Sequence, residues 1–559
     1  MSIAPAERAR ARREPPAKRF VKPGRAFSLG PEARASAALY LVSFLVYTAV
    51  GVQVVVRKHV VVFDGMARLS HAFFVWWNAP PKLAAIGFVW PPVATLVYLP
   101  FALVRPLATS LVAMPVIAAA FGAGLILTLD RVFRLVGMRR SLRLPLLAAF
   151  GLDPMILFYA SNGMSEIVYL FFLSLGVYFF LRWYLDRAPS VLILSALFLA
   201  LATLSRYEVI SWAFLLIFVL IVALIRQHVS RAELEGSMLA YVAPISYGIG
   251  LWLFFNWLIL GDPLFWLRHQ APGAAANGPA GQAIAVTAPG PSISAWHIAS
   301  SLVQENLNLF VLAPLTLVAL LVLAVRRRDV MALAIALMIG LNAFFTGLLV
   351  YVSHAESYLQ LRYNMRAMPL AMIGVAWLYL RVAPRARIAV WAAALAIIVT
   401  SWPLTWNEMR TFPYQYLEQA FTRVLSTGKD QEGTASVGGY RVGIAGQKHA
   451  AAWVVGHIHG KNEILTDDAQ TFSVMLLSGR PDLFWDRIDK GDEAWLDVLS
   501  NPWGRVRYML VSSGVDDLIR AHYPAIADGT VPGFTVVHRG DGFTVVAVAP
   551  RPPQPKRPS

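Results

Sequence analysis

The sequence has 559 residues, of which 57% are hydrophobic and 14% are charged, and its formal net charge is +17 at pH 7. Soluble domains carry roughly 25% charged residues, so this composition excludes a purely soluble enzyme and an intrinsically disordered protein. A large positive charge suggests nucleic acid in a soluble protein, but the apolar background makes membrane topology the first property to test. Because there is no cysteine, disulfide scaffolds, zinc–thiolate sites, iron–sulfur clusters and cysteine nucleophiles are also excluded.

A basic tail, residues 1–36, precedes the first apolar run, residues 37–56. A run of about 20 apolar residues is long enough to cross a bilayer, and no small-residue cleavage site follows it. Since basic flanks stay on the cytoplasmic side, we expect an uncleaved signal anchor in a bacterial plasma membrane, with its N-terminus in the cytoplasm.

Ten further apolar runs bring the predicted number of membrane spans to eleven. They lie near residues 108–129, 144–161, 165–181, 190–205, 209–225, 238–260, 302–325, 330–351, 367–380 and 388–403. The expected fold is therefore a polytopic α-helical membrane protein whose transmembrane domain covers residues 37–403. An odd number of spans places the C-terminal region outside the cell.

Every second connector between these runs is basic, and basic connectors face the cytoplasm. They contain Arg131, Arg134, Arg139, Arg140, Arg143, Arg182, Arg187, Arg226, Arg231, Arg326, Arg327, Arg328, Arg381, Arg385 and Arg387. The other connectors hold isolated acids, single arginines and aromatic residues. We therefore expect any chemistry on the extracytoplasmic face, and we assign the net charge mainly to topology, with no nucleic-acid partner.

The first outer loop, residues 57–107, contains apolar stretches interrupted by Pro80-Pro81 and Pro91-Pro92. Prolines at this spacing break helices, so the loop is predicted to form short interfacial helices. Its tryptophans suit the headgroup region of a membrane; they are Trp76, Trp77 and Trp90.

A second outer loop, residues 261–300, is rich in Ala, Gly and Pro over residues 271–295. It has no helical face and is predicted to be mobile. It is either a lid over a substrate or a plain connector.

Residues 404–550 have a soluble composition and are predicted to form an extracytoplasmic α/β domain. The predicted helices cover residues 415–425, 450–457 and 494–499, and the predicted strands cover residues 441–445, 463–466, 508–512, 534–537 and 543–547. The proline-rich end, residues 551–559, is predicted to be disordered.

Asp64 follows the first span and is the main catalytic candidate. An acid in an apolar setting at the membrane surface can have a raised pKa and act as a general base. Alternatively, Asp64 is a solvated acid that balances Arg57, Lys58 or Arg68.

Glu166 begins the fourth apolar run, where the helix dipole stabilises an acid and Ser165 or Asn162 could cap the helix. Asp153, before Pro154, either lies at membrane depth, where ionisable residues are usually functional, or marks a helix break that reaches water.

Several outer residues could bind a donor phosphate. Arg206 can do so through charge-assisted hydrogen bonds, or can instead pair with Glu208 or Glu166. Arg362 and Arg366 are four residues apart and share a helical face, so that an anion between them would relieve their repulsion; snorkelling to the interface is the alternative. The remaining binding candidates are Lys82, Glu166, Tyr207, Glu208, His354 and Glu356. No motif indicates a metal site, so no cofactor is expected, although a divalent metal stays possible.

The layout resembles the GT-C class of membrane glycosyltransferases, and most closely the bacterial dolichyl-phosphate-mannose mannosyltransferase-like proteins. The resemblance covers about residues 37–403 and rests on short motifs, namely Phe63-Asp64-Gly65, Trp90-Pro91-Pro92-Val93, Glu166, Ser205-Arg206-Tyr207-Glu208 and Gly261-Asp262-Pro263-Leu264. It implies a polyprenyl-phosphate-sugar donor, transfer with inversion, Asp64 as general base, Glu166 in the active site, and outer-face basic residues on the lipid phosphate.

The sequence departs from this family in two ways. Asp64 stands alone where many members have an acidic pair, which favours metal-free base catalysis. Trp76-Trp77 is followed by Asn78, so the Trp-Trp-Asp-type signature of oligosaccharyltransferases is absent and transfer of a whole oligosaccharide is not expected.

The predicted function is transfer of a single mannose or arabinofuranose to a glycolipid, polysaccharide or protein acceptor of the cell envelope. A polytopic transporter or lipid-linked sugar flippase is the alternative, although the sequence lacks the matched halves of many transporters. A non-catalytic anchor for the C-terminal domain is a third possibility.

Overall fold

The computed structural model describes residues 30–88, 90–265, 293–353, 359–412, 416–434, 442–514 and 517–551. Most of the predicted basic tail, most of the predicted mobile loop and the predicted disordered end lie outside these ranges. So do His354 and Glu356.

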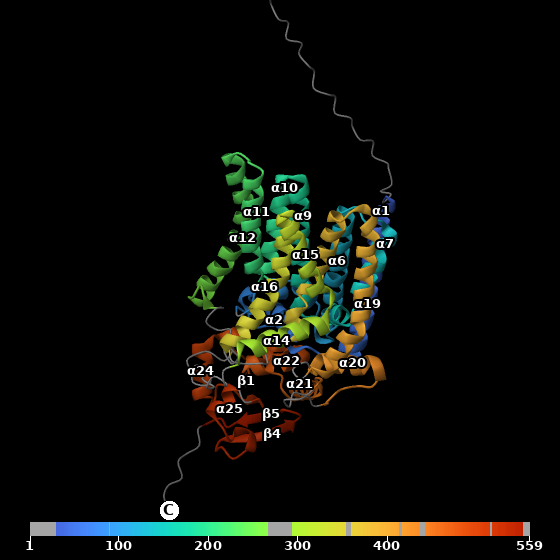
Figure 1. Cartoon of the computed structure of the whole chain (residues 1–559). Helices are drawn as coiled ribbons and strands as arrows, with labels where there is room; N and C mark the ends of the chain where they lie inside the picture. Colours follow the sequence, from blue (N-terminus) through green and yellow to red (C-terminus); the bar gives the residue numbers. More distant parts are fainter. Residues whose placement is uncertain are drawn as a thin grey trace, which may run out of the picture.

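A bundle of long helices forms one part of the molecule, and a small sheet with short helices lies beyond one end of it (Figure 1). Each of the eleven apolar runs is helical. The helices that follow these runs are α1 (Pro31–Gly51), α6 (Ala113–Leu135), α7 (Arg140–Gly151), α8 (Pro154–Tyr159), α9 (Ser165–Asp186), α10 (Pro189–Thr203), α11 (Val209–Arg226), α12 (Arg231–Leu260), α14 (Ala295–Leu309), α15 (Leu312–Arg327), α16 (Val330–Ser353), α18 (Ala367–Arg381) and α19 (Arg387–Thr411). The start of α1 and the α11–α12 connection lie at the end of the bundle opposite the sheet (Figure 1).

Seven helices in the described ranges are long and apolar enough to cross a membrane, or up to eight if α14 and α15, bent by 107°, form one broken span. The expected number was eleven. Two of the other predicted spans, α10 and α18, have 15 residues each, or about 22 Å at 1.5 Å per residue, against a hydrocarbon core of about 30 Å. A third is divided into α7 and α8 by Asp153-Pro154, where the Asp153 side chain accepts from the Met155 N–H and caps α8.

The first outer loop forms short helices, as the prolines predict. They are α2 (Phe63–Trp77), the 3₁₀ helix η2 (Leu83–Ile86), α3 (Val93–Leu96), α4 (Leu99–Ala102) and α5 (Arg105–Thr109). Before them, α1 continues as a π-helical segment, Val52–Arg57. Two of the tryptophans expected in the headgroup region also connect parts of this loop: Trp76 donates to the Leu99 carbonyl at 2.9 Å and Trp77 to the Ala102 carbonyl at 3.0 Å.

The C-terminal region contains a five-stranded sheet of order β2-β1-β3-β5-β4. Strands β1 and β2, and β1 and β3, are parallel, whereas β5 is antiparallel to β3 and β4. The strands are β1 (Ile464–Thr466), β2 (Phe484–Trp485), β3 (Tyr508–Ser512), β4 (Phe534–Gly540) and β5 (Phe543–Val548), and the helices are α20 (Tyr416–Thr427), α21 (Ala445–His457), α22 (Asp468–Ser478), α23 (Arg487–Lys490), α24 (Asp492–Ser500) and α25 (Leu518–His522).

Four of the five predicted strands are confirmed. The strand predicted over 441–445 is wrong, because residues 442–444 are not in a strand and α21 begins at Ala445. Similarly, α14 begins at Ala295, inside the range that was expected to be a loop.

The two faces of the sheet belong to different hydrophobic clusters. Leu510 and Val545 pack in a cluster that also contains Met66, Leu69 and Phe73 of α2. The neighbouring residues on the strands point to the other face, where a second cluster includes α24 and α25, as the two-residue period of a strand requires. The sheet therefore shares a core with α2, the helix that begins at Phe63.

Candidate active site

Charged side chains from four connections meet where α2 lies against the bundle. Asp64 is in the first turn of α2 and Glu166 is in the first turn of α9. Arg206 and Glu208 lie between α10 and α11, and Arg362 lies in α17 (Leu361–Asn364). All five are residues that the sequence predicted at the outer face.

Ion pairs join these residues, together with Arg366, into two groups, the Arg362–Asp64 pair and a group of Arg206, Glu166, Glu208 and Arg366. The two groups lie close enough for their charges to interact. Arg362 Nη1 donates to Asp64 Oδ2 at 2.9 Å, and Arg206 Nη1 donates to Glu166 Oε1 at 2.7 Å. Glu208 Oε1 accepts from Arg206 Nη2 at 2.9 Å and from Arg366 Nη2 at 3.3 Å. The band is defined here as Asp64, Glu166, Arg206, Glu208, Arg362 and Arg366.

The intramolecular pairing considered for Arg206 is thus present with both acids. Arg362 and Arg366 each bind a different carboxylate, Asp64 and Glu208. They lie near the ring of Tyr363, at 5.3 and 5.4 Å from its centroid, so cation–π attraction offsets part of their repulsion.

Two glycines allow α2 to lie close to the start of α9. A Cβ on Gly65 would lie 3.1 Å from the Gly163 carbonyl oxygen, and a Cβ on Gly163 would lie 2.7 Å from Met114 Cβ. Gly163 also has φ +84°, which favours glycine, and its carbonyl accepts from Tyr98 Oη at 2.6 Å. This close approach places Asp64 beside the Glu166 turn.

The caps considered for α9 are not formed. Met164 is the N-cap residue of α9, and its side chain makes no capping hydrogen bond. Asn162 Oδ1 accepts from the Met164 N–H at 3.0 Å, and Ser165 Oγ accepts from Arg68 Nη2 at 3.3 Å.

Arg68 is a member of the site that the sequence suggested only as a charge partner for Asp64. It is 7% exposed, and its Nε and Nη1 atoms have no hydrogen-bond partner among the described residues. Its guanidinium carbon lies 5.6 Å from the centroid of the Trp90 ring. The available signal was its position four residues after Asp64, which places both on one face of a helix.

Other buried polar atoms near Arg68 also lack partners within the described ranges, namely Glu166 Oε2 and Arg366 Nε. Buried polar groups without partners are costly in a folded protein. Their concentration in one place is typical of a site that completes its hydrogen bonds with a ligand.

The pKa of Asp64 differs from the expectation. Burial would raise this pKa, but the charge and hydrogen bond of Arg362, and the charges of Arg68 and Arg206, outweigh burial and lower it. The raised pKa predicted from the apolar surroundings is therefore wrong, because three arginines distant in sequence or one turn away were not placed. The pKa of Glu208 is also lowered, where Arg206 and Arg366 outweigh burial.

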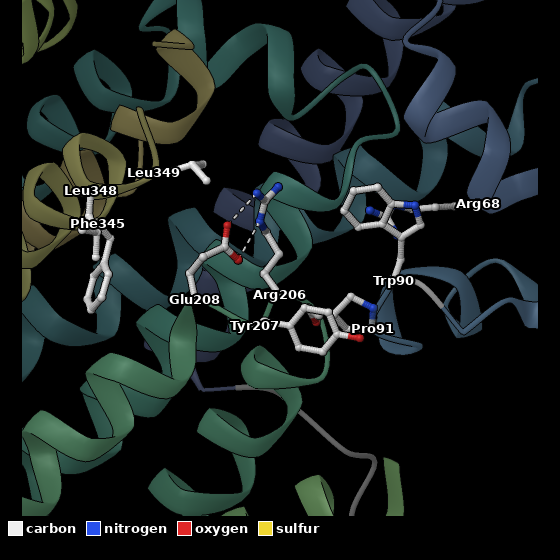
Figure 2. A pocket seen from close by; sticks show the side chains of 10 residues that line it. Arg68, Trp90, Pro91, Arg206, Tyr207, Glu208, Phe345, Leu348 and Leu349 are labelled. Atoms are coloured by element: carbon white, nitrogen blue, oxygen red, sulfur yellow. Dashed lines mark hydrogen bonds and ion pairs between the residues drawn. The ribbon is translucent and has the colours of Figure 1, made fainter. Parts of the chain in front are cut away.

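A first cavity of about 440 Å³ lies on one side of the band (Figure 2). Its charged residues are Arg68, Arg206 and Glu208, and its apolar wall includes Trp90, Phe345 and Leu348. Figure 2 shows the Arg206–Glu208 pair facing the cavity between Phe345 and the Arg68–Trp90 stack. The Val93 N–H donates to the Leu204 carbonyl at 2.9 Å and holds the Trp90 segment beside the Arg206 turn.

A second cavity of about 290 Å³ contains Asp64 and Arg362 and reaches the C-terminal region. Its polar residues are Asp64, Tyr159, Gln360, Arg362, Tyr416 and Glu418. The band of ion pairs thus contributes to two cavities, of which the first is mainly apolar and the second is mainly polar.

Two other predicted residues are not members of the band. Tyr207 lines the first cavity, and its hydroxyl accepts from Trp252 Nε1 at 3.0 Å. Lys82 precedes η2 and lines neither cavity. In the described ranges, no group of three or more His, Asp or Glu side chains is arranged to hold a metal ion.

No protein-family model and no curated protein matches the sequence. Among solved structures, the chain is similar to ArnT from Cupriavidus metallidurans bound to undecaprenyl phosphate, with a TM-score of 0.55 and 15% identity over 93% of this chain and 100% of that chain. The apo form of ArnT gives a TM-score of 0.55 at 14% identity, over 94% and 100% of the two chains. The oligosaccharyltransferase AglB from Archaeoglobus fulgidus gives 0.47 at 10% identity, over 90% and 72%.

At this identity the similarity to ArnT concerns the fold alone. The protein is a multi-pass membrane protein with the GT-C fold, and the fold that the resemblance implied is confirmed. The narrower resemblance to the dolichyl-phosphate-mannose mannosyltransferase-like proteins stays a prediction.

Proposed function

We propose that the protein is an inverting glycosyltransferase at the outer face of a bacterial plasma membrane. It transfers one sugar, mannose or arabinofuranose, from a polyprenyl phosphate to an acceptor of the cell envelope. The observation that carries this proposal is the buried guanidinium of Arg68, whose Nε and Nη1 have no hydrogen-bond partner among the described residues and which lines a largely apolar cavity. The GT-C fold and the undecaprenyl phosphate bound to ArnT support the same class of donor.

The first cavity suits a lipid phosphate. Its wall of Trp90, Phe345 and Leu348 can accept prenyl carbons, while Arg68 and Arg206 can bind the phosphate. Arginine forms strong, bidentate hydrogen bonds to phosphate. Arg206 already pairs with two acids, whereas Arg68 has N–H groups to donate, so Arg68 is the main phosphate ligand.

Asp64 acts as the general base. The oxygen of an acceptor hydroxyl bonds to the anomeric carbon, the bond from that carbon to the phosphate oxygen breaks, and the hydroxyl proton passes to the Asp64 carboxylate. Polyprenyl phosphate leaves with the bonding electrons, and the arginines stabilise its charge. Because this leaving group is a weak base, no general acid is needed.

The Arg362–Asp64 ion pair controls the ionisation and the basicity of Asp64. A lowered pKa keeps Asp64 ionised and able to accept a proton, but the same ion pair makes it a weak base. A donor phosphate that attracts Arg362 would weaken the pair and increase the basicity of Asp64 when the donor is bound. Donor binding therefore precedes deprotonation of the acceptor.

The experiment is to incubate the purified full-length protein with a panel of polyprenyl-phosphate sugars and an envelope extract, and to measure released polyprenyl phosphate. We expect release with one sugar, and loss of release in Asp64→Asn with unchanged donor binding. Appreciable turnover by Asp64→Asn would contradict the role of Asp64 as general base. Movement of an intact donor across a vesicle membrane without release would support the transporter or flippase instead.

A further inference from the structure

The second cavity contains a buried acid that the proposed reaction does not use. Glu418 lies in α20, outside the helix bundle, and is 3% exposed. Its Oε1 accepts from the hydroxyl of Tyr159, on α8, at 2.6 Å. Both side chains line the same cavity as Asp64.

The residues that line this second cavity differ in polarity from those that line the first. Six of its ten lining residues have polar side chains, and they come from α2, α8, α17 with its preceding residue, and α20. At about 290 Å³, it is at the small end of ligand sites, which span roughly 300–1,000 Å³. It therefore suits a single hydroxyl-rich unit, and not a prenyl chain.

Charge restricts the ligand further. Two carboxylic acids, Asp64 and Glu418, line the cavity, together with one arginine, Arg362. Arg362 already pairs with Asp64. Among the described residues that line this cavity, a phosphate would face two carboxyl groups and one guanidinium that already pairs with Asp64. Burial also raises the pKa of Glu418, so that an added negative charge would raise the cost of its ionised form.

We propose that the second cavity binds the terminal unit of the acceptor as a neutral sugar, and that Glu418 and Tyr159 hydrogen-bond its hydroxyl groups and present one of them to Asp64. This rests on the proposed glycosyl transfer, in which that hydroxyl loses its proton to Asp64 and bonds to the anomeric carbon. The acceptor site is thus completed by α20, and phosphate-bearing acceptor groups are excluded from it.

The test uses the full-length protein in nanodiscs with the donor that releases polyprenyl phosphate. The acceptor probes are butyl mannoside, butyl glucoside, butyl arabinofuranoside and butyl mannoside 6-phosphate, and the products are measured by mass spectrometry. We expect transfer to at least one neutral glycoside and none to the phosphorylated glycoside. Glu418→Gln and Tyr159→Phe should raise the acceptor KM about tenfold, the loss of one hydrogen bond to a charged group, with the donor KM within about twofold of wild type.

Glu408→Gln is the matched control. Glu408 is a partly buried acid at the end of α19, bonded to Asn308 Nδ2 at 3.0 Å and outside both cavities. A purely structural Glu418–Tyr159 contact would change thermal stability without a selective change in acceptor KM. If Glu418→Gln does not fold, Tyr159→Phe decides.

Unchanged acceptor KM values in both variants, or a preference for butyl mannoside 6-phosphate, would overturn the inference while the transferase assignment stands. If no probe is glycosylated, saturation-transfer NMR of the same glycosides in the presence of polyprenyl phosphate decides: binding to wild type that weakens in Glu418→Gln supports the site, and no binding overturns it. Absence of polyprenyl phosphate release from every donor would instead contradict the proposed function.

Discussion

Arg362 donates to Asp64 across 298 positions of sequence, from α17 to the first turn of α2. The contact joins the residue proposed as general base to a connection near the other end of the bundle sequence. It also explains why the pKa of Asp64 lies below its usual range, although the loss of water around part of the half-exposed carboxylate acts in the opposite direction.

Replacing Arg362 should shift the pH dependence of the reaction. The acid limb of kcat/KM reports the pKa of the base in the free enzyme. Because Arg362 lowers the pKa of Asp64, Arg362→Gln should move that limb to higher pH, while Arg362→Lys should move it less. The measurement is a pH profile of polyprenyl phosphate release, and an acid limb at the same pH in Arg362→Gln would contradict the coupling.

The Arg362–Asp64 pair also determines the direction in which the stability of the folded protein changes with pH. A lowered pKa in the folded state means that the contribution of Asp64 is present above its unfolded pKa and is lost as pH falls through the folded value. The wild type should therefore lose more stability than Asp64→Asn when the pH is lowered through this range. The effect is small, because the Asp64 side chain is 50% exposed and solvent screens the pair. Thermal unfolding of both proteins across that range measures it, and parallel curves would contradict it.

Replacing Arg68 should weaken donor binding selectively. Loss of a hydrogen bond to a charged group costs about 1.5–3 kcal/mol, so Arg68→Met should raise the donor KM on the order of 10- to 100-fold, with partial recovery in Arg68→Lys. Arg105→Met is the control, since Arg105 lies in the same outer loop and is 3.9 Å from the centroid of the Trp77 ring but lines neither cavity. Equal effects of the two substitutions on donor KM would show that Arg68 acts through folding.

Gly163→Ala should destabilise the protein and reduce turnover. The added Cβ would lie 2.7 Å from Met114 Cβ and 3.0 Å from the Tyr98 hydroxyl, at a φ of +84°. Gly137→Ala has a similar φ of +74° and nothing within 4 Å, so it carries the backbone cost without the clash. The difference between the two, measured by thermal unfolding, should be about 2 kcal/mol, as for overpacking; equal effects would argue against the tight packing of Gly163 against Met114 and Tyr98.

Chelation should leave turnover unchanged. The Asp64 carboxylate accepts from a guanidinium, and the nearby charges of Arg68 and Arg206 oppose a divalent cation at the same oxygen atoms. We expect equal rates of polyprenyl phosphate release with and without EDTA. A loss restored by Mg²⁺ or Mn²⁺ would contradict metal-free catalysis.

The apolar runs predicted the helices well, because long hydrophobic segments have few other stable structures in a bilayer. They did not predict the bend between α14 and α15, since hydropathy measures length and composition but not direction. The strand expected over 441–445 was wrong for a related reason: a short apolar stretch does not distinguish a strand from the start of a helix.

For the site, the alternation of basic connectors placed Asp64, Glu166, Arg206 and Arg362 on one face. Glu166 was considered as a partner of Arg206, but Asp64 and Arg362 could not be paired, because they are 298 residues apart. The error in the pKa of Asp64 follows directly from the missing partners. Arg68 was underestimated because its burial depends on how α2 packs, which no local pattern contains.

The cluster that Leu510 and Val545 share with Met66, Leu69 and Phe73 limits how this protein can be divided or diversified. A soluble fragment that begins after α19 would expose the side of α22 that packs against α2, and a membrane fragment that ends there would leave that part of α2 uncovered. Chimaeras that exchange the C-terminal region between related proteins would therefore have to exchange α2 with it, and α2 contains Asp64 and Arg68. Changes in the extracytoplasmic region and changes in the reaction centre are thus expected to be inherited together.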